Sequence, residues 1–211
     1  MSNKKLILIF IPILFLAGLA LFIRIVQYEP LFPDTPDVDS ETTLQIPIYG
    51  EDPITGDKKA PITLIAFEDF ACDHCKTQSD LLTKILDQYP KSLKIIWKIL
   101  PINRYPIDST LSAEYAYCAN QQGKFELFKL YAFENGKNLS EATLEEIATQ
   151  IKLDPKKLTT CLESGTAQTY TEAIKNISQQ LHIQELPTLF INNKQIQPPT
   201  SVEGWKTLLN I

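Results

Sequence analysis

Two cysteines separated by two residues are the strongest candidates for chemistry in this chain. Cys72 and Cys75 enclose Asp73 and His74, where an apolar run gives way to a helical pattern. A Cys-x-x-Cys between a strand and a helix is the arrangement of dithiol redox chemistry. Unpaired N–H groups and the positive dipole of the first helical turn favour the thiolate of Cys72. Cys75 lies one turn further on the same face, so the pair can close a redox-active disulfide, and no separate cofactor or metal is expected.

The residues beside the pair are expected to act on the thiolate in opposite directions. His74 is expected to stabilise the thiolate of Cys72 and so make the disulfide a stronger oxidant, the alternative being an exposed, neutral turn histidine. The carboxylate of Asp73 is expected to raise the pKa of Cys72. Upstream, Glu68 and Asp69 either tune the site, relay protons or lie in a solvated turn.

The elements around the motif indicate an α/β domain. Ile62–Phe67 is a short apolar run that predicts a buried strand, and the helix from Cys72 ends at Pro90. Leu93–Ile99 predicts a second strand, so strand, helix and strand imply parallel pairing through a right-handed crossover. A short edge strand over Leu44–Tyr49 is expected before them.

Helical spacing follows the second strand for about sixty residues. Four helices without a catalytic pattern are expected there as a cap beside the sheet: Ser112–Gln122, Lys124–Asn135, Ser140–Ile151 and a short helix that begins at Asp154 and Pro155. Three further elements complete the domain: a helix over Thr166–Leu181, a hairpin over Leu189–Ile196 and a helix that begins at Ser201.

The N-terminus is expected to anchor the chain in a membrane. As a helix, residues 6–26 would be roughly 31 Å long, enough to cross the hydrocarbon core. Lys4 and Lys5 precede this run, which places the N-terminus in the cytoplasm and the domain outside, in the periplasm or at the cell surface. A cleaved signal peptide with Gly18-Leu19-Ala20 at its cleavage site is the alternative. The acidic, proline-rich residues 27–43 are expected to form an extended linker, and residues 44–211 form the domain, with a helical insertion at about 102–165.

Charge and cysteine count narrow the class of protein. The net charge of −5 and the lack of a basic stripe argue against nucleic acid as a partner. Four cysteines fit an oxidising compartment. Cys118 and Cys161 lie 43 positions apart on two predicted helices, and they are buried thiols, a structural disulfide or a second redox pair that passes electrons to Cys72. Export favours the structural disulfide, and the spacing gives no signature of a redox pair.

From Ile62 to about Leu209 the chain resembles the DsbA-like thiol–disulfide oxidoreductases of the thioredoxin superfamily. The matching stretches are 67–75, Pro101, 118–125 and 186–192. The resemblance implies a thioredoxin-like fold with an inserted all-helical subdomain, preceded by the transmembrane helix. It implies that Cys72 is the exposed nucleophile, that Cys75 closes the disulfide, and that Pro187 is a cis proline facing it. Leu186 and Asp73 are then expected to contact the substrate.

The function expected from these features is an exported oxidase that introduces disulfide bonds. Its partners would be reduced or unfolded exported polypeptides and a membrane thiol-oxidising protein. A reductase or isomerase would use the same residues in reverse. A copper chaperone or other metal module would use Cys72, Cys75 and His74 as ligands, and a peptide-binding protein with a vestigial motif would tolerate Cys72→Ser.

Overall fold

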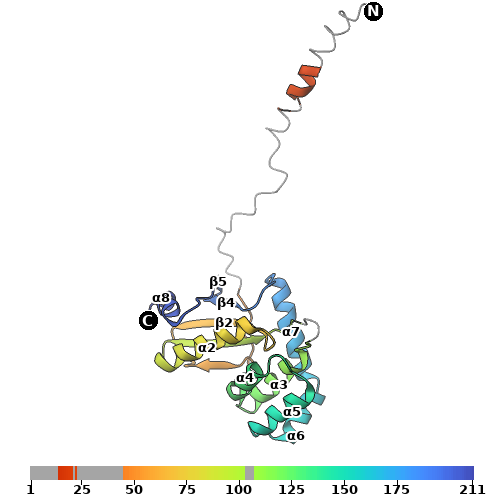
Figure 1. Cartoon of the computed structure of the whole chain (residues 1–211), viewed down its shortest axis with the longest axis vertical. Helices are drawn as coiled ribbons and strands as arrows, with labels where there is room; N and C mark the ends of the chain where they lie inside the picture. Colours follow the sequence, from red (N-terminus) through yellow and green to blue (C-terminus); the bar gives the residue numbers. More distant parts are fainter. Residues whose placement is uncertain (1–13, 21, 23–44, 103–106) are drawn as a thin grey trace, which may run out of the picture. The chain divides into compact units, whose positions relative to one another are not determined.

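The computed structural model describes residues 14–20, 22, 45–102 and 107–211 (Figure 1). The chain divides into two units, residues 1–42 and 43–211. In the first unit, residues 14–20 and 22 are helical, and the described part of the chain contains no helix with the length and apolar character needed to cross a bilayer. Most of the expected membrane segment, residues 6–26, and all of the expected linker, residues 27–43, lie outside the described residues.

The second unit is built on a five-stranded mixed sheet in the order β1-β3-β2-β4-β5. The strands are β1 (Ile54–Gly56), β2 (Ile62–Glu68), β3 (Leu93–Ile99), β4 (Thr188–Ile191) and β5 (Lys194–Ile196). The expected parallel pair is present as β2 and β3, in a register that sets Ile62 opposite Leu93. The pairs β1–β3, β2–β4 and β4–β5 are antiparallel.

Both faces of the central strands are buried, which explains their continuous apolar sequence. Side chains alternate along β2: Leu64 and Ala66 join the larger core, whereas Ile65 and Phe67 join the smaller one. The larger core lies against α2 (Asp73–Gln88), α8 (Val202–Leu209) and the helical insertion, and the smaller one lies against α7 (Thr166–Gln180).

Four helices between β3 and α7 form the predicted insertion, gathered beside the sheet (Figure 1). They are α3 (Thr110–Gln121), α4 (Phe125–Glu134), α5 (Glu141–Gln150) and α6 (Pro155–Glu163). Short connections and local caps separate them. Asp154, for example, accepts hydrogen bonds from the first N–H groups of α6, with Pro155 in its first turn.

The predicted edge strand over Leu44–Tyr49 is wrong: residues 45–49 have no strand pairing, and the strand that precedes β2 at an edge of the sheet is Ile54–Gly56. Side chains instead hold this stretch. The Asn193 Oδ1 accepts from the Ile46 N–H at 3.2 Å, and the buried Lys98 ammonium donates to the Pro47 carbonyl at 2.8 Å. Pro47 has no N–H to give to a ladder, so these contacts replace strand pairing.

Candidate active site

The Cys-x-x-Cys lies where β2 ends and α2 begins. Cys72 is the N-cap of α2, with extended backbone angles (φ −100°, ψ 113°), and its Sγ accepts a hydrogen bond from the Cys75 N–H at 3.3 Å. The buried side of α2 repeats every three or four residues, at Cys75, Gln78, Ser79, Leu82 and Ile85. Burial of this stripe against the sheet fixes the rotation of α2, and so leaves Cys72 at the surface with Cys75 beneath it.

Cys72 has the properties of a reactive thiolate. It is partly exposed, and its pKa is lowered to about 6. The largest cause is a hydrogen bond from the Cys75 thiol, and the backbone N–H groups of Cys75 and His74 add to it. Partial burial and the Asp69 carboxylate act in the opposite direction. At neutral pH most Cys72 side chains are therefore thiolates, the form that attacks and leaves in disulfide exchange.

Cys75 has the opposite character. Its side chain has 0 % exposure. Burial is the main cause of a strongly raised pKa, and the hydrogen bond to Cys72 and the nearby Glu68 carboxyl raise it further. Cys75 therefore holds its proton while Cys72 carries the charge, and this asymmetry assigns attack by an outside thiolate to Cys72.

Asp69 anchors the loop between β2 and α2. It is buried, and its carboxylate accepts from the Ala71 N–H (2.9 Å), the Ile102 N–H (2.7 Å) and the Ser109 hydroxyl (2.8 Å). These bonds join the active-site loop to the segments that lead into the helical insertion. A solvated turn was one of the alternatives that the sequence allowed for Asp69, and the turn that contains it is instead buried.

Glu68, the last residue of β2, is a buried acid near the cysteine pair, for which the sequence allowed several roles. Its side chain has 0 % exposure, and among the described residues neither carboxyl oxygen has a hydrogen-bond partner. Burial raises the pKa of Glu68 to about 8, while Lys129 of α4 acts to lower it. The Lys129 ammonium lies 3.8 Å from the centroid of the Trp97 ring. A protonated carboxyl beside Cys75 can exchange protons with a thiol that is otherwise shielded from water.

His74 and Asp73 lie in the first turn of α2. Both are exposed, and His74 contributes to the lowered Cys72 pKa through its backbone N–H. The Asp73 carboxylate forms an ion pair with Lys137, from the loop between α4 and α5, and this pairing is the main cause of its lowered pKa. The carboxylate that raises the pKa of Cys72 is that of Asp69.

The segment before β4 faces the nucleophile. The Leu186–Pro187 peptide bond is cis, and the Leu186 carbonyl oxygen lies 3.6 Å from the Cys72 Sγ, which donates to it only when Cys72 is protonated. Leu186 and Pro187 are both partly exposed. A backbone carbonyl next to a reactive sulfur provides a place where an extended peptide can form main-chain hydrogen bonds.

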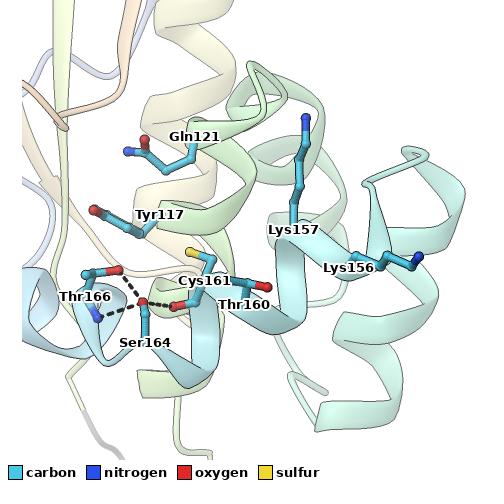
Figure 2. A pocket seen from close by; sticks show the side chains of 8 residues that line it. All are labelled: Tyr117, Gln121, Lys156, Lys157, Thr160, Cys161, Ser164 and Thr166. Atoms are coloured by element: carbon cyan, nitrogen blue, oxygen red, sulfur yellow. Dashed lines mark hydrogen bonds between the residues drawn. The ribbon is translucent and has the colours of Figure 1, made fainter.

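The remaining two cysteines lie in the helical insertion. Cys118 of α3 and Cys161 of α6 form a disulfide with their Cα atoms 5.9 Å apart. Cys118 is fully buried, whereas Cys161 lines an open pocket of about 410 Å³ with Tyr117 and Gln121 (Figure 2). At the end of α6, the Ser164 hydroxyl donates to the Cys161 carbonyl at 2.7 Å. The disulfide thus joins α3 and α6, the first and last helices of the insertion.

Comparison with known proteins places this arrangement in a family. The model of a family described as thioredoxin matches residues 49–210, most of the chain. The chain belongs to the thioredoxin family. Its Cys-x-x-Cys pair is Cys72 and Cys75, and helices α3–α6 form its helical insertion.

Individual relatives are distant. The chain is 23 % identical over 162 residues to Na(+)/H(+) antiporter NhaA 3 of Salinispora tropica, covering 76 % of this chain but only 25 % of the relative, so it spans about a quarter of that protein's length. Disulfide bond formation protein D of Bacillus subtilis is 23 % identical over 154 residues, covering 69 % of each protein. The crystal structure of oxidised BdbD from Bacillus subtilis superposes with a TM-score of 0.61 at 21 % identity, covering 76 % of this chain and 91 % of the other.

Proposed function

We propose that this chain is an exported oxidase that donates the Cys72–Cys75 disulfide to cysteines of other exported polypeptides. The observation that carries the proposal is the asymmetry of the pair: the Cys72 pKa is lowered to about 6, while Cys75 is buried with a raised pKa. Stabilising the Cys72 thiolate favours the reduced enzyme, which makes the disulfide a better oxidant. Extracytoplasmic location is supported by the N-terminal apolar run and by the second disulfide.

The exchange proceeds in two balanced steps. In the first, a substrate thiolate attacks the Cys72 sulfur, the Cys72–Cys75 bond breaks, and Cys75 leaves and takes up a proton, for which the protonated Glu68 carboxyl is a nearby donor. In the second, another substrate thiolate attacks the substrate sulfur of the mixed disulfide, and the Cys72 thiolate leaves. The substrate loses two electrons and the enzyme gains two.

Substrate placement is assigned to the segment at Leu186 and Pro187. The Leu186 carbonyl lies 3.6 Å from the Cys72 sulfur, so an extended peptide bound along this segment brings its own sulfur to Cys72. To act repeatedly the enzyme needs a thiol-oxidising partner, which we place in the membrane beside the proposed anchor of residues 6–26.

The reverse direction, as a reductase or isomerase, uses the same two residues, and the metal-binding alternative requires Cys75 as a ligand. Cys75 has 0 % exposure, so a metal ion would have to displace both its proton and the groups that cover it, which disfavours a metal module.

The reduction potential of the pair decides the direction. We would equilibrate the Cys118→Ser, Cys161→Ser variant in glutathione buffers, so that only the Cys72–Cys75 pair reports. The oxidase predicts a potential of about −230 mV or less negative, in the range of glutathione-linked and oxidising members of this chemistry. A reduction potential of about −270 mV or more negative would mean that the pair acts as a reductant, opposite to the proposed direction.

A further inference from the structure

A groove between α2 and α4 begins one helical turn beyond the nucleophile. Its volume is about 470 Å³, and its α2 wall starts at Lys76, which follows Cys75 directly and donates its N–H to the Cys72 carbonyl at 3.1 Å. Phe133, on the α4 wall, packs against Phe70 of the active-site loop with ring centroids 5.0 Å apart. The groove and the active-site loop therefore share a wall.

The α4 wall of this groove exposes apolar side chains. Leu127 and Leu130 lie on successive turns, and each is 48 % exposed. Both line the groove together with Phe133, which is almost fully buried. Neighbouring exposed leucines beside a groove are typical of a surface that a binding partner buries.

The rim of the groove is acidic. Three exposed carboxylates line it, Asp80 on α2 and Glu126 and Glu134 on α4. Two lysines also line it, but Lys129 is buried with its ammonium over the Trp97 ring, which leaves Lys76 as the more accessible cation of the lining. The complementary ligand is therefore a segment with apolar side chains flanked by lysine or arginine.

Resting on the proposed function, we propose that the α2–α4 groove binds the part of the reduced polypeptide next to its reacting cysteine, and that it selects apolar segments flanked by basic residues. None of its lining residues belongs to the Leu186–Pro187 segment, so a polypeptide can use both surfaces at once. Contacts on each side of the reacting sulfur would hold the mixed disulfide in place for the second exchange step.

Binding is measured first, without thiol chemistry. Three fluorescent peptides share a core in which serine replaces cysteine: one has no tail, one carries a tail with two leucines and two lysines, and one carries the same tail with glutamates for the lysines. Fluorescence anisotropy with the full chain is expected to show about tenfold tighter binding of the lysine tail than of the glutamate tail, or about 1.4 kcal/mol. Salt is expected to reduce this preference.

Two variants and a matched control locate the effect. Glu126→Lys, Glu134→Lys reverses the rim charge and is expected to transfer the preference to the glutamate tail. Leu127→Ser, Leu130→Ser is expected to weaken both tails and leave the tailless peptide unchanged. Glu145→Lys, Glu146→Lys makes the same charge change on the exposed side of α5 and is expected to retain the wild-type preference.

The same tails on dithiol peptides then test the link to exchange. Faster oxidation of the lysine-tailed dithiol by the wild type, lost in the rim variant, supports the proposal. Equal binding of all three peptides, loss of the preference in the α5 control, or self-association through these leucines would overturn it. If exchange fails with every dithiol while the anisotropy preference persists, the oxidase assignment fails and the groove stands as a binding site for basic apolar segments.

Discussion

Glu68 provides a direct test of how burial controls this active site. Its side chain is fully buried, and its pKa is raised to about 8, chiefly by burial, from an ordinary value of 4.5. Since the folded pKa lies above the unfolded one, the stabilising contribution is complete below about pH 4.5 and is lost as the pH rises through 8. Each unit of pKa difference corresponds to about 1.4 kcal/mol, so the loss is at most about 5 kcal/mol.

The substitution Glu68→Gln removes this titration while keeping the size of the side chain. We expect the free energy of unfolding of the parent protein to fall relative to Glu68→Gln between pH 4 and pH 9, by several kcal/mol. Urea unfolding at a series of pH values measures it. A Cys72→Ser, Cys75→Ala background removes the titration of the two thiols and needs no reductant, so the Cys118–Cys161 disulfide stays intact.

Glu146→Gln on the exposed side of α5 is the control and should change the pH dependence little. The reasoning would be refuted by a difference between Glu68→Gln and its parent that stays constant across this pH range. In that case Glu68 would be ionised in the folded protein throughout, with its charge fully compensated by Lys129.

Three further outcomes follow from the cysteines. The rate of Cys72 alkylation by iodoacetamide should titrate with a midpoint near pH 6, and Cys75→Ala should raise that midpoint because the thiol hydrogen bond is lost; an unchanged midpoint would contradict this cause. With a reduced peptide and an external oxidant, Cys75→Ser should accumulate a mixed disulfide visible by mass, whereas accumulation in Cys72→Ser would reassign the nucleophile. Cys118→Ser with Cys161→Ser should lower the free energy of unfolding by about 4 kcal/mol for a loop of 43 positions, and denaturant titration showing no loss would remove the stabilising role.

Much of the architecture could be predicted because the signals are local. Apolar runs of strand length mark β2 and β3, and the three-to-four-residue spacing of buried residues marks α2. The boundary at Cys72 could be anticipated because an N-cap depends on residues within one helical turn. The edge strand predicted over Leu44–Tyr49 is absent for a reason that is not local. Pro47 has no N–H for a strand ladder, and the Ile46 N–H is bound by the side chain of Asn193, which is far away in the sequence.

The sequence by itself determined the reactive pair, the order of the elements and the separation of the helical insertion, since each depends on neighbouring residues. The charge partners and pKa shifts of the acidic residues around the cysteine pair depend on the tertiary structure alone. Glu68 became a buried acid because β2 is covered on both faces, and Lys129 reaches it from α4, about sixty residues away. The charge of Asp73 is taken up by Lys137, and Asp69 rather than Asp73 opposes the thiolate. A pKa depends on the burial and charge within a few ångströms, and that neighbourhood is assembled only when the insertion packs against the sheet.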